Sequence, residues 1–249
     1  MNRFREARRI VGRSSSRWSF SAQGSGSSNE YSILNDPDLV AWYDAKVASS
    51  LIQADAPNRI SQWSDLSGLG HHLNQATTTA QPSLEDGSSN QPSVLFDGLA
   101  HYMRTGSFTL LKPTTIVLVA KTVAWSLNTA WFDGLNLNSG QLYEATSTPT
   151  LALYAGSTAA ANSDATVGSY HVVTAVFNGA SSSLIVNNGI PTTGNSGAGG
   201  DMGGLNLGSY NSPTGVSNTQ FKAIAMFSSA KSQKQIDEIV KWMQGRYAL

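Results

Sequence analysis

The sequence predicts an all-β protein: a sandwich of two antiparallel sheets, followed by one C-terminal helix and preceded by an extended N-terminal arm. Between residues 39 and 227, short β-prone segments are separated by clusters of Gly, Pro, Asp and Asn, the pattern of strands joined by turns. A helical pattern occurs once, after residue 232. Charged residues are only 13% of the 249-residue chain, against about a quarter in an average soluble domain. We interpret the chain as one large all-β domain with a tail, rather than two small domains.

The first 30 residues differ from the rest in charge. They contain six arginines against Glu6 and Glu30, and they end in the Gly/Ser-rich residues 23–28. We interpret residues 1–30 as a basic Ser/Gly-rich arm and linker and residues 31–249 as the domain. Three roles fit the arm: a mitochondrial presequence, a solvated disordered tail, or a docking arm whose aromatic rings enter a partner's grooves while its arginines pair with acids. The residues of such a docking arm are Arg3, Phe4, Arg5, Arg8, Arg9, Arg13, Arg17, Trp18 and Phe20.

The domain contains about a dozen predicted strands with no helix between them. The most apolar one, over residues 114–121, is typical of a central strand covered on both faces. Such a string of strands closes by meandering and Greek-key pairing, so a β-sandwich is expected. The other predicted strands are residues 39–43, 59–63, 93–96, 101–104, 130–132, 141–143, 150–154, 170–177, 183–186, 204–207 and 221–227.

A single helix is predicted at the end of the chain. Ser232 and Gln235 have the spacing of a capping box at its start. Its apolar positions recur at helical spacing on one face, and we expect this face to lie across an edge or end of the sandwich. These positions are Ile236, Ile239, Val240, Met243 and Tyr247.

Several segments in order carry a family resemblance. DLVAWYD (38–44), ISQWSDLSGLG (60–70) and QPSVLFDG (91–98) resemble the opening of concanavalin A-like, laminin-G-like jelly-roll domains. YHVVTAVF (170–177) with SLIVNNG (183–189), and FKAIAMF (221–227) with the final helix, are similar to the family's central strand pair and closing strand. The resemblance implies a two-sheet antiparallel jelly roll over residues 36–249. Domains of this kind occur in bacteriophage decoration, head-fibre and tail proteins.

The resemblance implies a fold but no activity, because this sandwich hosts glycosidases, lyases, lectins and structural modules. A retaining glycosidase of this fold would carry paired carboxylates with Glu-x-Asp-x-x-Glu spacing on one strand, and the chain has no such run. Met226 stands where the family's closing strand usually has glutamate. A lyase would need arginine near His171, and the predicted strands around it have none. We therefore expect a protein that is not an enzyme.

Metal binding is limited by the available ligands. The chain has no cysteine, which excludes thiolate sites. His71 and His72 are adjacent and would face opposite ways on a strand, and we expect Asp65 nearby to cap turn amides rather than to hold a metal. We expect no cofactor, with a structural calcium ion as the alternative. Its oxygen ligands would come from Asp133, Asn136, Asn138, Asp164 and Asp201.

Charge and hydropathy bear on the partners. Residues 122–221 contain no lysine or arginine, so we do not expect the body to bind nucleic acid. The chain has no apolar stretch of about 18 residues and no secretory h-region, so we expect neither a membrane span nor a secretory signal. Aromatic rings in this cation-free part could stack on neutral sugars, although each could instead belong to the core. These candidate glycan-contacting residues are Trp125, Trp131, Tyr143, Tyr154 and Tyr210.

Two functions follow from these patterns. The first is a non-enzymatic virion module, in many copies or as a homo-oligomer. The arm would anchor it to other particle proteins, and the jelly roll would contact host-surface glycans. It would be located in the virion, assembled in the host cytoplasm. The alternative is a stand-alone carbohydrate-binding module or lectin.

Overall fold

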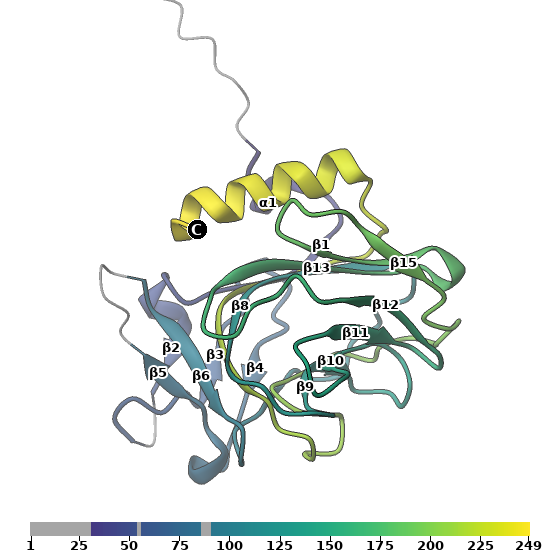
Figure 1. Ribbon diagram of the computed structural model, residues 1–249. Helices are drawn as coiled ribbons and strands as arrows, with labels where there is room; N and C mark the ends of the chain where they lie inside the picture. The colour runs from purple at the N-terminus through teal and green to yellow at the C-terminus, as the bar shows by residue number, and fades with distance from the viewer. Residues whose placement is uncertain (1–30, 54–55, 86–90) are drawn as a thin grey trace, which may run out of the picture. The chain divides into compact units, whose positions relative to one another are not determined.

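The computed structural model describes residues 31–53, 56–85 and 91–249. Within them the chain forms two antiparallel sheets and one α-helix, which confirms the predicted all-β jelly-roll sandwich with a C-terminal helix (Figure 1). The docking arm predicted over residues 1–30 lies outside the described residues, so its role stays a prediction. None of the helices in the described part is long and apolar enough to cross a membrane.

Sheet A is organised by its two longest strands, β8 and β17. In the described residues its order is β15-β14-β13-β8-β17-β6-β5, and β1 also pairs with β17. The first part of β17 pairs with β6 and the remainder with β1, so one long strand holds two neighbours on the same side. The strands are β1 (Leu39–Asp44), β5 (Ser83–Glu85), β6 (Ser93–Asp97), β8 (Thr114–Ala124), β13 (His171–Phe177), β14 (Ser182–Val186), β15 (Thr192–Gly194) and β17 (Asn218–Phe227).

Sheet B is made of shorter strands. Across the described residues its order is β12-β11-β10-β9-β16-β7-β4-β3-β2. Four 3-10 turns lie in the connections of the described chain: Ile33–Asn35, Ala48–Ser50, Thr78–Ala80 and Gly179–Ser181. The strands are β2 (Leu51–Ile52), β3 (Gln62–Trp63), β4 (Leu73–Asn74), β7 (Met103–Arg104), β9 (Ala130–Gly134), β10 (Gln141–Glu144), β11 (Leu151–Tyr154), β12 (Thr158–Asn162) and β16 (Leu205–Leu207).

The core has two layers, one on each face of sheet A. In β8, Ile116 and Leu118 belong to the cluster between the two sheets, whereas Val117 and Val119 belong to the cluster under the helix. Because successive side chains of a strand point to opposite faces, a strand with a core on each side is apolar throughout. The prediction of a central strand covered on both faces is thus confirmed.

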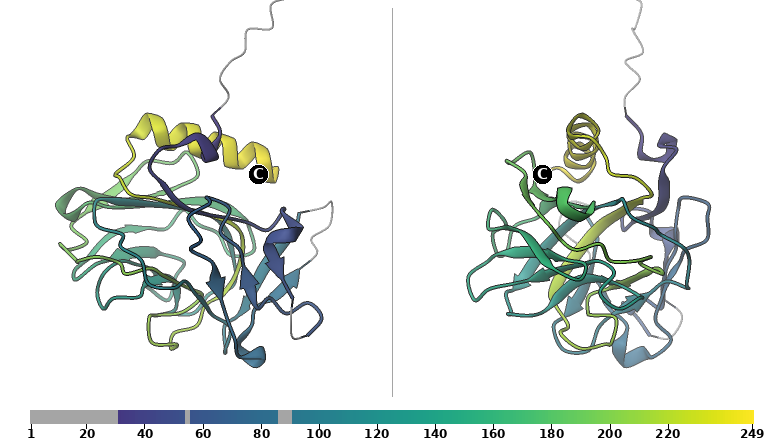
Figure 2. Two further views of the ribbon diagram at one scale, coloured as in Figure 1. Left: turned by 180° about the vertical axis from the view of Figure 1, so that it is seen from behind. Right: turned by 90° about the vertical axis from the view of Figure 1, so that its right-hand side faces the viewer.

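The terminal helix α1 (Gln233–Tyr247) covers the outer face of sheet A. The predicted capping box is present: the Ser232 hydroxyl accepts the Gln235 backbone N–H, and the Gln235 side chain accepts the Ser232 N–H. The expected position at an edge or end of the sandwich is wrong, because the apolar side of α1 packs on Val117, Val119 and their neighbours in the middle of the sheet. Helix, sheet A and sheet B form three layers (Figures 1 and 2).

Asp65 organises the turn after β3, as expected. Its Oδ1 accepts backbone N–H groups of Trp42 and Ser67, each at 2.9 Å, and its Oδ2 accepts the N–H of His71 at 3.1 Å. The His71 ring stacks on Phe108 with centroids 3.8 Å apart. This polar stretch is therefore part of the scaffold.

Gly208, which follows β16, lies directly against a core side chain. Its φ is +83° and a Cβ there would overlap the Phe96 ring. We expect Gly208→Ala to lower the free energy of unfolding by about 2 to 3 kcal/mol, through backbone strain and overpacking together. Urea denaturation measures the loss.

Gly168→Ala is the matched control for this prediction. Gly168 has nearly the same φ, +85°, but a Cβ there would meet no atom within 4 Å. Its substitution should cause backbone strain but no overpacking, so we expect the free energy of unfolding to fall by only about 1 kcal/mol. Equal losses in the two variants would contradict the assigned contact with Phe96.

Candidate functional site

A row of polar side chains crosses the outer face of sheet B, the face turned away from sheet A. The row follows from strand register, because residues that pair directly across neighbouring strands point to the same face. The pairs are Gln62 with Asn74, Asn74 with Arg104, Arg104 with Asn206, Asn206 with Asp133, and Asp133 with Gln141. We call these six residues, from β3, β4, β7, β16, β9 and β10, the polar row.

Each strand builds the row by simple alternation. The neighbours of the row residues, such as Trp63, Leu73 and Leu142, are fully buried in the core between the sheets. With one apolar side chain pointing inward, the next residue must point outward. A two-residue strand can therefore place one core residue and one surface residue.

The loop of residues 208–215 is fastened over the middle of the polar row. The Asn206 amide donates to the carbonyl of Tyr210 at 2.6 Å, and the backbone N–H of Asn211 donates to Asp133 Oδ2 at 2.9 Å. Arg104 donates from Nε to Asn206 Oδ1 at 2.8 Å and from its other end to the Asn211 carbonyl. The loop therefore has a defined position on the sheet, and it buries Asn206 and Asp133 completely.

Three tyrosines gather beside this loop. Gln141 pairs directly with Tyr154, and Tyr143 follows two residues later on the same strand, so all three share the outer face. Tyr143 and Tyr154 are half-buried. Burial raises the pKa of Tyr210 to about 12, with Tyr143 and Asp133 close enough to add to the rise. We call Tyr143, Tyr154, Tyr210 and Gln141 the tyrosine face.

Asp133 is a carboxylate with an incomplete set of partners. Its Oδ2 accepts from Asn211 and from the Gln141 amide at 3.0 Å, while its Oδ1 is buried without a hydrogen bond. Burial raises the pKa of Asp133 to about 6, although these donors and Arg104 act in the opposite direction. The folded protein therefore holds a proton that the unfolded chain releases at a lower pH.

This raised pKa predicts a pH-dependent stability. The stabilising contribution of protonated Asp133 is complete below the unfolded-state pKa, near 3.8, and is lost as the pH rises through about 6. Relative to Asp133→Asn, the wild-type free energy of unfolding should fall by on the order of 2 kcal/mol between pH 4 and pH 7. Urea denaturation of both proteins at several pH values measures the difference between their free energies of unfolding. If this difference does not change with pH, Asp133 titrates as it does in water.

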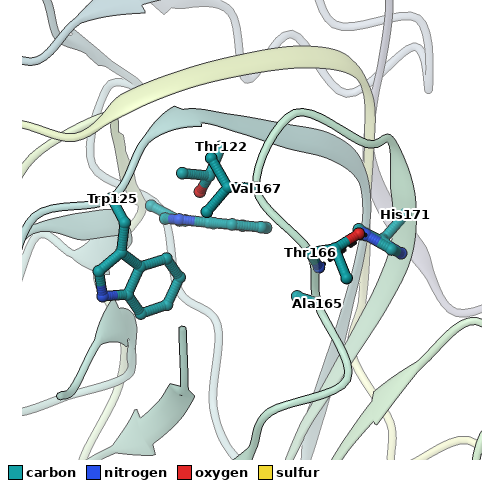
Figure 3. A pocket seen from close by; sticks show the side chains of 7 residues that line it. Thr122, Trp125, Ala165, Thr166, Val167 and His171 are labelled. Carbon is teal, nitrogen blue, oxygen red and sulfur yellow. Dashed lines mark hydrogen bonds between the residues drawn. The ribbon is translucent and has the colours of Figure 1, made fainter. Parts of the chain in front are cut away.

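The two candidate tryptophans lie away from the tyrosine face. Trp131 is 1% exposed and its Nε1 donates to Glu144 Oε1 at 3.0 Å, so its indole belongs to the core. Trp125 is partly buried and donates from Nε1 to the Thr146 carbonyl at 2.7 Å. It borders a shallow pocket at the rim between the sheets (Figure 3). The other residues that line this pocket are Thr122, Trp131, Ala165, Thr166, Val167 and His171.

Two residues that line this pocket, Thr166 and His171, are hydrogen-bonded to each other. The backbone N–H of Thr166 donates to Nε2 of His171 at 3.0 Å. Burial lowers the pKa of His171, which favours the neutral ring at neutral pH. The space holds little room for a ligand, since its empty volume of about 180 Å³ includes open solvent. We therefore place the candidate binding site on the tyrosine face.

The acidic residues do not converge. Asp133 and Glu144 lie on the neighbouring strands β9 and β10, but Asp133 points to the outer face while Glu144 points inward to Trp131 and Thr122. Asp201 Oδ1 accepts the N–H groups of Leu110 and Gly203, and Asn136 donates to its carbonyl.

The remaining calcium candidates are dispersed as well. Asp164 forms a local turn with Asn162, and Asn138 occupies a left-handed turn position, with φ +56°. In the described part of the chain, no group of three or more His, Cys, Asp or Glu could hold a metal ion. Asp133, Asp164 and Asp201 accept hydrogen bonds in turns and loop contacts, and a structural calcium ion stays a prediction.

Arg104, Asn206 and Gln141 belong to the polar row but were not included in the sequence prediction, and of the three only Asn206 is completely buried. The period-two pattern of their strands places each of them opposite a buried neighbour, but it does not show which strands are adjacent. Adjacency in sheet B joins residues more than 100 positions apart, such as Arg104 and Asn206. Pairing at such a distance is not encoded in local sequence patterns.

The fold and this face define a β-sandwich of the jelly-roll type, and solved structures share it. Domain 4 of AbnA, an extracellular arabinanase from Geobacillus stearothermophilus, solved in complex with arabinotriose, matches with a TM-score of 0.58 and 13% identity. The match covers 82% of this chain and 98% of that domain. The binding domain of Paraclostridial Mosquitocidal Protein 1 matches with a TM-score of 0.59 and 11% identity, over 85% of this chain and 53% of that one.

A third match is part of a larger enzyme. The Trypanosoma rangeli sialidase in complex with sialic acid matches with a TM-score of 0.56 and 13% identity, over 83% of this chain but only 33% of that one. No protein-family model and no curated protein matches the sequence. At these identities the comparisons show a shared fold.

Proposed function

We propose that this chain is a non-catalytic carbohydrate-binding domain that holds its ligand on the tyrosine face. The observation that carries the proposal is the convergence of Tyr143, Tyr154 and Tyr210 on one side of sheet B, next to the Gln141 amide. Aromatic rings offer apolar faces to the C–H groups of a sugar. An amide offers both a donor and acceptors to its hydroxyl groups.

The charge of the face favours a neutral sugar. Strands β9 to β12 and the loop of residues 208–215 lie within residues 122–221, which contain no lysine or arginine. Arg104, on the far side of the loop, is engaged by Asn206 and Asn211. A carboxylate or sulfate would therefore find no free cation on the tyrosine face, whereas uncharged hydroxyl groups find tyrosine and amide partners.

The structural neighbours suggest the first ligands to test. Domain 4 of AbnA was solved with arabinotriose, a neutral oligosaccharide. That domain matches almost over its whole length, which supports a comparison of binding between the two. We propose neutral oligosaccharides, with arabinotriose first, as probes for this chain.

Affinity electrophoresis tests the proposal. The full chain is run through gels that contain neutral polysaccharides, arabinan among them, and through gels without polysaccharide. We expect at least one neutral polysaccharide to retard the protein. No retardation by any neutral polysaccharide, or retardation only by acidic ones, would overturn the proposal.

We also propose that the N-terminal arm anchors the domain to a larger particle, such as a virion. The composition of the arm supports this second role, because its six arginines and its aromatic residues have the chemistry of a docking segment. Deleting residues 1–28 should release the protein from particles with which the full chain sediments. Unchanged sedimentation of the shortened chain, or no sedimentation of the full chain with any particle, would contradict this role.

A further inference from the structure

Two lysines lie over the ring of one tyrosine on the outer face of sheet A, and the charge of a third lysine acts on one of them. Tyr170 directly precedes β13, Lys121 lies in β8 and Lys222 in β17, and these three strands are neighbours in the sheet. Lys46, which follows β1, donates from Nζ to the carbonyl of Arg246 in the last turn of α1 at 3.0 Å. We call Lys46, Lys121 and Lys222, together with Tyr170, the lysine cluster.

Two of the three ammonium groups lie over the same ring. Nζ of Lys222 lies 4.0 Å from the centroid of the Tyr170 ring, and Nζ of Lys121 lies 4.8 Å from the same centroid. The Tyr170 hydroxyl is fixed by donating to Gln220 Oε1 at 2.7 Å. Cation–π attraction holds the lysines over the ring, but the ring carries no net negative charge to balance them.

Within the described residues the lysine cluster forms no ion pair, in contrast to the buried Lys231. Lys231 is 5% exposed, and its Nζ contacts Asp36 at 2.7 Å and Asp38 at 2.9 Å. Lys222 is also 5% exposed. Among the ion pairs of the described residues, however, none includes a lysine of the cluster.

Two acids of the described residues, Asp44 and Glu85, lie near the cluster, and neither forms an ion pair with its lysines. The Asp44 carboxylate accepts hydrogen bonds from Arg246 and Tyr247. Burial raises the pKa of Tyr170 and the charge of Glu85 adds to the rise, but Glu85 forms no ion pair with the lysines of the cluster. Desolvation lowers the pKa of Lys222, and the charges of Lys121 and Lys46 add to this effect. Because buried lysines are ordinarily paired, this arrangement is suited to an anion supplied from outside.

We propose that the lysine cluster is an oxyanion-binding site, for a sulfate, phosphate or carboxylate group of a ligand. The site lies on sheet A, whereas the tyrosine face lies on sheet B, so it is independent of the proposed carbohydrate site. The ammonium groups of Lys121 and Lys222, which share the Tyr170 ring, can donate charge-assisted hydrogen bonds to such an anion, and Lys46 adds positive charge nearby. The fixed Tyr170 ring keeps these two ammonium groups close together.

Nuclear magnetic resonance titration tests this site. The ¹⁵N-labelled full chain is titrated with sodium sulfate, inorganic phosphate and sodium acetate, with sodium chloride keeping the ionic strength constant. We expect saturable shifts of the Tyr170 and Gln220 amide signals, with a Kd on the order of 1 mM or below for at least one oxyanion. Tighter binding of sulfate and phosphate assigns the site to tetrahedral oxyanions, and tighter binding of acetate assigns it to carboxylates.

Matched variants distinguish oxyanion binding at the lysine cluster from a general effect of salt on the protein. Lys121→Met and Lys222→Met keep an unbranched apolar side chain but remove the ammonium group and its charge, and each should weaken binding at least about 10-fold. Lys241→Met, on the exposed side of α1, should leave the Kd unchanged. Because Lys222 is buried, the partly exposed Lys121 provides the deciding variant if Lys222→Met fails to fold. Absence of saturable shifts, or equal affinities of Lys121→Met and wild type, would overturn the proposal.

Discussion

Replacing Tyr143 and Tyr154 together with alanine is expected to weaken carbohydrate binding on the order of 100-fold. The two rings share the outer face of sheet B and are both half-buried, so each can offer one face to a sugar. An aromatic side chain at the centre of a contact contributes on the order of 1 to 2 kcal/mol, and every 1.4 kcal/mol is about a factor of ten in Kd. Isothermal titration calorimetry with the best oligosaccharide from the electrophoresis screen measures the loss.

The controls for this variant distinguish stacking from stability. The pair Tyr143→Phe and Tyr154→Phe keeps both rings and should retain most of the affinity. Tyr170→Ala removes a tyrosine of similar exposure from the other sheet and should leave affinity for the neutral sugar unchanged. An affinity of the double alanine variant equal to that of wild type would place the ligand elsewhere.

The second large effect concerns stability: Asp44→Ala is expected to lower the free energy of unfolding by about 4 kcal/mol. The Asp44 carboxylate is fully buried and joins β1 to the last turn of α1. It accepts the hydroxyl of Tyr247 at 2.7 Å, Nε of Arg246 at 2.7 Å and the N–H of Lys46 at 2.9 Å. Without it, a buried phenol and a guanidinium lose their partner, which costs more than the pair contributes.

Asp237→Ala is the matched control, because Asp237 is an exposed aspartate on the same helix. Substitutions at such positions change stability by less than about 0.5 kcal/mol. Guanidinium denaturation compares both variants with wild type. If Asp44→Ala loses no more stability than Asp237→Ala, the contact between β1 and the end of α1 does not hold the helix in place.

The sequence predicts the parts of the fold that depend on local patterns. The apolar run of residues 114–121, the capping box at Ser232 and the turn at Asp65 all appear as expected. Each depends on neighbouring residues along the chain, so composition and spacing are sufficient. The confirmed all-β class rests on the same kind of evidence.

Features that depend on pairing between distant residues are harder to predict from the sequence. The position of α1 on the face of sheet A depends on Val117 and Val119, more than 100 residues earlier. The aromatic candidates illustrate the same limit: Tyr143, Tyr154 and Tyr210 share one face, whereas Trp131 lies in the core and donates to Glu144. One added residue in β9, a bulge beside Trp131, breaks the alternation there. Side-chain direction after a bulge does not follow from period two.

The central claim is that a neutral carbohydrate binds across the tyrosine face, and chemical-shift mapping tests it most directly. The ¹⁵N-labelled chain is titrated with the neutral oligosaccharide that binds best, starting with arabinotriose. The account predicts that the largest shifts fall on Gln141, Tyr143, Tyr154 and the loop of residues 208–215. Largest shifts around Trp125 and His171, at the rim pocket, would contradict it.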